Sequence, residues 1–158
     1  MIVRPAKRED ADAISELWFS LVSYHRNLSN LMPIPADDGK ARYASRIRWS
    51  VDDDHIQTFV AELEGELIAY VYGTVIDLLP EMFQDEKSGV VGDIFVAEAH
   101  RSQGVGTALM EVMKDWFRLR GVSHYEWYVA ALNEDGIRFW EKTMGGQKVM
   151  IRMRADVD

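Results

Sequence analysis

One stretch constrains the fold of this chain more than any other part of the sequence: a strand, a short loop and a glycine-containing helix start in direct succession. Residues 90–96 are rich in β-branched and aromatic side chains, which is typical of a strand. Residues 101–106 form a turn with two glycines, and from Val105 to Gly121 apolar side chains recur at helical spacing. A helix with such an apolar face has to cover another element, so we expect a sheet flanked by helices.

The sequence ahead of this stretch predicts a strand, two amphipathic helices and a hairpin. Apolar residues recur three and four positions apart in both helical segments. The two hairpin segments are rich in β-branched and aromatic residues and flank the tight turn Glu64-Gly65. A loop with two prolines, residues 27–39, separates the helices. These elements are expected at residues 2–4, 11–25, 40–51, 56–62 and 67–76.

Behind the glycine-containing helix, the pattern predicts a strand, a helix and a final strand. The strand spans His124–Ala130, Asn133 caps the helix, and the last strand, Gln147–Met153, carries apolar side chains at alternate positions. The element order is therefore β-α-α-β-β-β-α-β-α-β, an α/β (α+β) fold in which helices flank a mixed, mostly antiparallel sheet. Because the sequence contains no repeat or linker, residues 1–158 are expected to form a single domain.

Composition narrows the classes of function. The chain has 158 residues, a net charge of −8 and no cysteine. The acidic balance disfavours nucleic acid and anionic membranes as partners, and the lack of thiols excludes disulfides, thiolate metal sites and a cysteine nucleophile. The four histidines are far apart in sequence, so we expect no metal site. The sequence starts without an apolar leader and holds no apolar run of the ~20 residues that span a membrane, which predicts a cytoplasmic protein.

The loop ahead of the glycine-containing helix has the features of a phosphate site. Amide groups at a helix N-terminus are unpaired, and Gly104 and Gly106 let the backbone approach a bulky anion. Arg101 adds a side chain that can bond a phosphate through two N–H groups. A Walker loop needs a Lys-Ser or Lys-Thr pair after the second glycine, and the dinucleotide fingerprint needs a third glycine. The sequence has neither, which disfavours nucleoside triphosphates and dinucleotides.

This loop resembles the acetyl-CoA loop of the GNAT acetyltransferase superfamily, written Arg/Gln-x-x-Gly-x-Gly/Ala, through Arg101, Gly104 and Gly106. Residues 93–96 are similar to the central strand of that family, and residues 133–142 to its later segment with an Asn, aromatic residues and a Lys. The resemblance implies the GNAT fold and an N-acetyltransferase that moves the acetyl group of acetyl-CoA to an amine. In detail, the short motifs look closest to enzymes that act on polyamines and related small amines.

The resemblance also implies which residues hold acetyl-CoA. The strand that ends at Val96 splays from the following strand, so its free backbone groups pair with the pantetheine arm. A backbone N–H of Phe95 or Val96 polarises the thioester carbonyl, and Asn133 reaches the same arm in addition to capping its helix. The implied contacts with acetyl-CoA come from Ile94, Phe95, Val96, Arg101, Ser102, Gln103, Gly104, Val105, Gly106, Thr107 and Asn133.

Acetyl transfer to an amine needs a group that removes a proton, because a free alkylammonium has a pKa near ~10. Asp93 is the first candidate for this base, and the roles of substrate anchor and of structural carboxylate are open for it as well. Gly92 stands where the compared polyamine enzymes carry a further carboxylate, and Glu126 or Tyr128 of the neighbouring strand are the alternatives. Trp140 occupies the place of the tyrosine that protonates the thiolate in many family members. Indole cannot donate a proton in this way, so water or another tyrosine is the expected donor.

Two further functions are compatible with the same sequence. A non-catalytic module that binds acyl-CoA as a sensor would keep the cofactor loop without the family tyrosine, and a scaffold would bind no CoA at all. We expect a homodimer, because dimers are the commonest assembly of soluble proteins. The amine is expected to contact the loops at residues 27–39 and 77–87, whose shape the sequence does not define.

Overall fold

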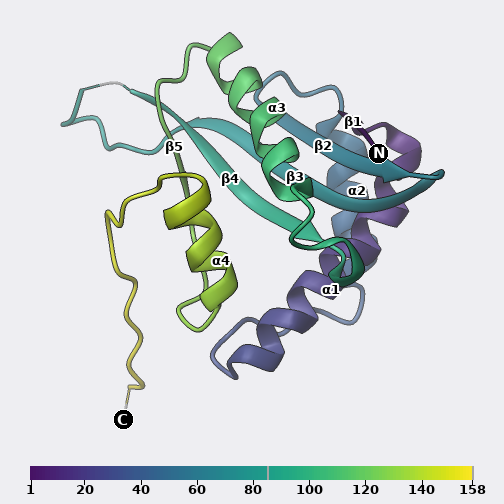
Figure 1. Cartoon of the computed structure of the whole chain (residues 1–158). Coiled ribbons are helices and arrows are strands. Elements are labelled where there is room, and N and C mark those ends of the chain that lie inside the picture. Colours follow the sequence, from purple (N-terminus) through teal and green to yellow (C-terminus); the bar gives the residue numbers. More distant parts are fainter. Residues whose placement is uncertain (85, 158) are drawn as a thin grey trace.

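Five strands form one sheet with the spatial order β1-β2-β3-β4-β5 (Figure 1). The computed structural model describes residues 1–84 and 86–157; residue 85 of the predicted loop and residue 158 of the predicted domain lie outside the described residues. The strands are β1 (Ile2–Pro5), β2 (Ile56–Leu63), β3 (Glu66–Asp77), β4 (Lys87–Val96) and β5 (Tyr125–Trp127). Strands β1 to β4 pair antiparallel in sequence order, and β5 pairs parallel to β4. The predicted mixed, mostly antiparallel sheet is confirmed.

Helices cover both faces of the sheet, and they are α1 (Ala11–Leu28), α2 (Gly39–Ser50) and α3 (Val105–Leu119). Helices α1 and α2 lie on one face and α3 on the other (Figure 1). The alternation of side chains along β3 makes this possible, since Tyr70 and Tyr72 pack with α1 and α2 whereas Ala69 and Val71 pack under α3. In the part of the chain that the structure describes, no helix combines the length and the apolar character needed to cross a membrane.

The predicted hairpin forms between β2 and β3. Glu64 and Gly65 join the two strands with φ angles of 54° and 87°. Two consecutive residues with positive φ make a tight turn whose twist matches that of the flanking strands. The hairpin thus places β3 at the centre of the sheet, between β2 and β4.

Strands β4 and β5 pair over three residues only, with Gly89–Val91 opposite Tyr125–Trp127. The strand predicted at His124–Ala130 is therefore shorter than expected. Residues 92–96 of β4 have no strand partner on this side within the described chain, while their other edge stays paired with β3. After β5 the chain forms a short helix and a π-helical turn, α4 (Glu134–Arg138) and Phe139–Thr143.

The final strand predicted at Gln147–Met153 does not form in the described residues. This segment is extended and exposed, and it runs away from the body of the molecule (Figure 1). Gly145 has a φ of 73°, and the amide of Gly146 donates to the carbonyl oxygen of Trp140 at 2.8 Å. This turn directs the chain away from the sheet, so the alternating apolar side chains have no strand of their own chain to join.

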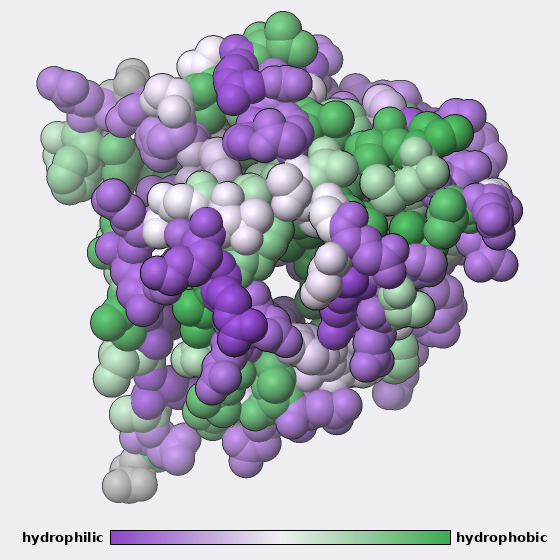
Figure 2. Space-filling view, in the orientation of Figure 1, coloured by the Kyte–Doolittle hydropathy of each residue, from purple (hydrophilic) through white to green (hydrophobic). Residues whose placement is uncertain are grey.

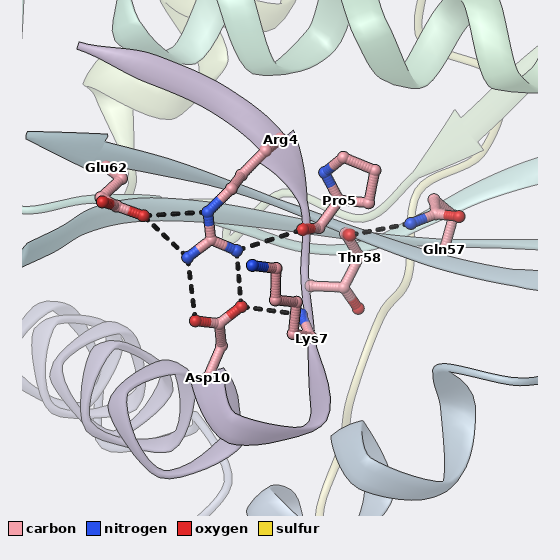
Figure 3. Close-up of polar contacts among 7 residues, drawn as sticks. All are labelled: Arg4, Pro5, Lys7, Asp10, Gln57, Thr58 and Glu62. Carbon is pink, nitrogen blue, oxygen red and sulfur yellow. Dashed lines mark hydrogen bonds and ion pairs between the residues drawn. The ribbon is translucent and has the colours of Figure 1, made fainter. Parts of the chain in front are cut away.

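An ion-pair network fixes β1 to the residues that lead into α1 (Figure 3). The Arg4 guanidinium donates to both carboxylate oxygens of Asp10, at 2.7 and 3.0 Å, and to Glu62 of β2 at 2.9 Å. Asp10 also accepts the amide of Lys7 at 2.7 Å. The bond to Arg4 is the main reason why the pKa of Asp10 is lowered. This contact therefore stabilises the fold above the ordinary carboxyl range and is lost as the pH falls through the lowered pKa.

The close approach of α3 to the sheet requires a glycine in β4. A Cβ atom at Gly89 would lie 2.8–2.9 Å from ring atoms of Phe117, which stacks on Tyr125. We predict that Gly89→Ala lowers the free energy of unfolding by about 1–3 kcal/mol, because the ring has to move out of a packed position. Urea unfolding followed by circular dichroism measures this loss. In the double variant Gly89→Ala/Phe117→Leu, the loss in free energy of unfolding should be smaller than the sum of the losses in the two single variants. If the losses were strictly additive, the assigned clash would be contradicted.

Candidate functional site

The diverging ends of β4 and β5 border a cleft of about 540 Å³. Figure 2 shows the molecule hollowed between α4 and the loop ahead of α3. Gln103 is the one predicted cofactor residue that does not line this cleft, because its side-chain amide turns back to the carbonyl oxygen of Ala99 at 3.1 Å. The predicted cofactor residues that do line it are Ile94, Phe95, Val96, Arg101, Ser102, Gly104, Val105, Gly106, Thr107 and Asn133.

One end of the cleft is the N-terminus of α3. The loop ahead of it contains Ser102 and Gly104 with φ angles of 60° and 81°. Gly104 is the N-cap of this 15-residue helix, which has no side-chain cap. The first amides of the helix, from Val105 onward, have no carbonyl partner within the helix. They form a group of N–H donors that favours a negatively charged ligand.

The backbone of β4 also offers bonding groups to the cleft. The amide of Ala97 donates to Ile68 of β3 at 2.8 Å. Because successive residues of a strand direct their backbone groups to opposite edges, the N–H and C=O groups of Val96 face away from β3, toward the cleft. The carbonyl oxygen of Val96 accepts a bond there from Nε of Arg101 at 3.0 Å. Of the two predicted donors to a thioester carbonyl, Phe95 and Val96, this alternation favours Val96.

Tyr24 of α1 connects the loop ahead of α3 with α4. The Arg101 guanidinium lies over the rings of Tyr24 and Phe95, 5.1 and 5.4 Å from their centroids. The Tyr24 hydroxyl donates to Oδ1 of Asn133 at 3.2 Å, and the same oxygen accepts the amide of Gly136 at 3.0 Å. The predicted cap at Asn133 is therefore confirmed. The contact of Arg101 and Asn133 with acetyl-CoA stays a prediction.

A second cavity, of about 450 Å³, lies among α1, α2 and the segment that joins them. Three side chains, those of Leu21, His25 and Asp93, line both this cavity and the cleft. They mark the place where the two spaces meet. A ligand in the cleft and a ligand in the second cavity would be neighbours at these three residues.

Asp93 is partly buried at this junction and is held by α2. The Tyr43 hydroxyl donates to its Oδ2 at 2.7 Å. Burial raises the pKa of Asp93, and the Tyr43 bond, the Arg46 charge and His25 reduce this rise without cancelling it. Burial likewise lowers the pKa of His25. A carboxylate with a raised pKa is a stronger base than an exposed one, which suits a group that takes a proton from an amine.

Three of the residues around Asp93 escaped the sequence analysis: Tyr43, His25 and Arg46. Tyr43 is buried and lies one helical turn before buried Ile47, so the helical phase is the signal that could have found it. Nothing in the sequence indicates the position of Arg46, whose Nε bonds the hydroxyl of Tyr72 on β3 at 3.3 Å. His25 reaches the site only because α1 crosses the end of β4, which is a tertiary arrangement.

The other sequence-based candidates lie in different surroundings. Glu126 is exposed on β5 and is absent from the described residues that line either cavity. Tyr128 lines the cleft but is 89% exposed. Trp140 also lines the cleft, but it is buried and stacks on Trp127 with the ring centroids 4.3 Å apart, so it packs as part of the core.

Comparison with known proteins places this geometry in a family. The family described as "Acetyltransferase (GNAT) family" matches residues 22–145. An "Uncharacterized N-acetyltransferase" of Archaeoglobus fulgidus is 25% identical over 140 residues, which cover 89% of each chain. The structure of a tetramutant of the BH1408 protein of Bacillus halodurans superposes with a TM-score of 0.86 at 20% identity and covers 99% of this chain and 100% of that one. The aminoglycoside N-acetyltransferase AAC(6′)-Iy in complex with CoA gives a TM-score of 0.75 at 13% identity, with 99% and 93% covered.

The two structural likenesses show a shared fold over nearly the whole length of the chain. The family match covers most of the sequence and includes β4, the loop ahead of α3 and α4, which are the elements that border the cleft. The chain belongs to the GNAT acetyltransferase family.

Proposed function

We propose that this protein transfers the acetyl group of acetyl-CoA to the nitrogen of an amine, with the thioester in the cleft and the amine in the second cavity. The observation that carries the proposal is the meeting of the two cavities at Leu21, His25 and Asp93. Direct transfer requires the two reactants to be in contact, and a carboxylate at the point of contact can take the released proton.

The residues of the cleft fit acetyl-CoA. The free edge of β4 offers backbone groups to an extended ligand, and the N-terminus of α3 favours a phosphate. A Cβ atom at Gly104 would meet nothing within 4 Å, so the backbone is open to a bulky anion there. When bound, acetyl-CoA supplies an acetyl carbon as a thioester, whose bond to sulfur breaks when the amine nitrogen attacks.

Groups of the site then take up the proton that the amine releases and stabilise the negative charge that develops on the carbonyl oxygen. Asp93 accepts a proton from the amine, and Tyr43 holds its carboxylate in place. The N–H group of Val96 stabilises the negative charge that develops on the carbonyl oxygen. A thiol has a pKa near ~8.5, so the leaving thiolate can take its proton from water, and Tyr24 and Tyr128 also present phenol groups in the cleft.

A module that binds acyl-CoA without turnover is the second candidate, because Trp140 is buried in the core and cannot serve as the acid that its position suggests. One measurement distinguishes the two functions. Release of free thiol from acetyl-CoA on addition of amines indicates transfer, whereas saturable binding without release indicates the module.

Acetyl-CoA binding is tested by a charge placed at the start of α3. We predict that Gly104→Glu weakens binding at least about 100-fold in isothermal titration calorimetry, because a carboxylate would face the pyrophosphate. Gly121→Glu is the matched control, since Gly104 and Gly121 flank α3, have φ angles of 81° and 73° and have open space at the Cβ position. Only Gly104 lines the cleft. If both variants lost the same amount of acetyl-CoA affinity, the cause would be backbone strain and the assigned site would be contradicted.

The role of Asp93 is tested by the pH dependence of kcat/KM. The raised pKa predicts that kcat/KM increases with pH through a value above the ordinary carboxyl range, as Asp93 loses its proton. Asp93→Asn should lower kcat/KM by about 10²–10⁴-fold. Tyr43→Phe removes a bond that lowers the pKa of Asp93, so the same rise should move to higher pH. If kcat/KM increased at the same pH in Tyr43→Phe as in the wild type, the assignment of Asp93 as the base would be contradicted.

Stability measurements provide the control for this assignment. Because the pKa of Asp93 is raised, the folded protein holds this proton more tightly than the unfolded chain, and stability falls as the pH rises through the raised pKa. Asp93→Asn removes that loss, so we expect it to be more stable than the wild type at pH 7 and equal to it in acid. A variant destabilised at both pH values would mark Asp93 as a structural residue.

The exposed C-terminal segment supports the expected homodimer. Val149, Ile151 and Met153 alternate along it and are 76%, 79% and 85% exposed, and β5 is an edge strand of the sheet. Extended apolar segments and free sheet edges pair readily with a second copy of the same chain. We predict a dimer in multi-angle light scattering that becomes a monomer when residues 147–158 are removed. A monomeric wild type would contradict this assembly.

A further inference from the structure

The second cavity has walls that are mostly apolar. Trp18 of α1 stacks on Tyr43 of α2, with the ring centroids 4.8 Å apart and the planes 10° from parallel. Met32, Pro33 and Ile34, from the segment between α1 and α2, also line the cavity. Ile34 is 77% exposed, so an apolar ligand in the cavity would remove this side chain from water. The cavity therefore favours a ligand with an apolar or aromatic body.

The charges around this cavity allow for one ammonium group. Asp93 is the sole carboxylate among the described residues that line it, and Arg42 and Arg46 add two positive charges. Arg42 also pairs with Asp38 at 2.8 Å, with both side chains largely exposed. Arg46 is fixed against β3, where its guanidinium lies 4.8 Å from the centroid of the Tyr72 ring.

A second positive charge on the ligand would find no partner among these residues. One ammonium group can pair with the Asp93 carboxylate before the ammonium gives up its proton. Another would lose part of its hydration in a largely apolar space where Asp38 is already paired with Arg42 and Arg46 carries a positive charge, which is unfavourable without a free carboxylate to compensate. His25 offers no negative charge either.

We propose that the amine acetylated by this protein is a primary monoamine with an apolar or aromatic body, and that polycationic amines are poor substrates. This inference rests on the proposed acetyl transfer and specifies its acceptor. It replaces the polyamine preference suggested by the short sequence motifs, because those motifs lie around the cleft and in α4, whereas the walls of the second cavity come from α1, α2 and the segment between them.

A matched pair of amines tests the proposal. n-Hexylamine and 1,6-diaminohexane have the same carbon chain and differ only in the second amino group. With acetyl-CoA in excess and thiol release as the readout, we expect kcat/KM to be at least about tenfold higher for n-hexylamine, after correction for the two reactive ends of the diamine. Equal values, or a preference for the diamine, would overturn the proposal.

Two matched variants show whether the cavity is responsible for this preference. Ile34 lines the cavity, whereas Leu31, three residues earlier and 62% exposed, does not. Ile34→Asp places a second carboxylate at the apolar wall and should shift the ratio of the two kcat/KM values toward the diamine by about tenfold. Leu31→Asp should leave the ratio unchanged. The same shift in both variants, or in neither, would assign the preference to another part of the molecule and overturn the proposal.

Calorimetry with CoA present separates this proposal from the proposed function. If n-hexylamine binds more tightly than 1,6-diaminohexane but neither amine is acetylated, the selectivity of the cavity stands and acetyl transfer fails. If both amines are acetylated without the expected preference, acetyl transfer stands and the selectivity fails. If neither amine binds or reacts while CoA binds, the second cavity is not the amine site and the inference is wrong.

Discussion

The early separation of β5 from β4 is the constraint on which the rest of the site depends. The two strands share three residue pairs, and beyond Val91 this edge of β4 has no strand partner among the residues that the structure describes. The other edge remains paired with β3, so β4 stays extended while one side of its backbone faces the cleft. Helix α3 can lie close to the sheet because Gly89 has no side chain to oppose Phe117, and its free N-terminus then reaches the same space. One interruption of a sheet thus brings strand amides and helix amides, two groups of backbone donors, to the same cleft.

The position of Asp93 on this strand links reactivity to stability. Its carboxyl group is withdrawn from water where α1 crosses β4, and the price is a folded state that favours the proton. The Tyr43 hydroxyl and the Arg46 charge reduce this cost, but they do not remove it. Without these neighbours the pKa of Asp93 would be raised further, and with stronger compensation it would return toward the ordinary carboxyl value. The residues around Asp93 therefore set a balance between these two extremes.

The sequence predicted the fold class and most of the residues that line the cleft because these rest on local patterns. Periodicity located the helices, the turn at Glu64-Gly65 located the hairpin, and the glycines at 104 and 106 marked the start of α3. The failed strand at 147–153 shows the limit of such patterns, since alternation describes a segment that can form a strand and not whether a partner is within reach. Arg46 and His25 could not be predicted for a similar reason. Their importance arises from contacts between α1, α2 and β4 that no short motif encodes.

The two cavities are built from different elements of the fold. Strand β4, the loop ahead of α3 and α4 border the cleft, and they hold the sequence motifs on which the resemblance to the family rests. The second cavity is built from α1, α2 and the segment that joins them, and among the described residues that line it Asp93 alone comes from β4. Substitutions in its walls can therefore change the size and charge of the second cavity without moving the N–H groups that line the cleft. Under the proposed acetyl transfer, this separation would let the acceptor change while the cleft stays the same, and the charges of Arg42, Arg46 and Asp93 would then bear more directly on the choice of amine than the likeness of the fold.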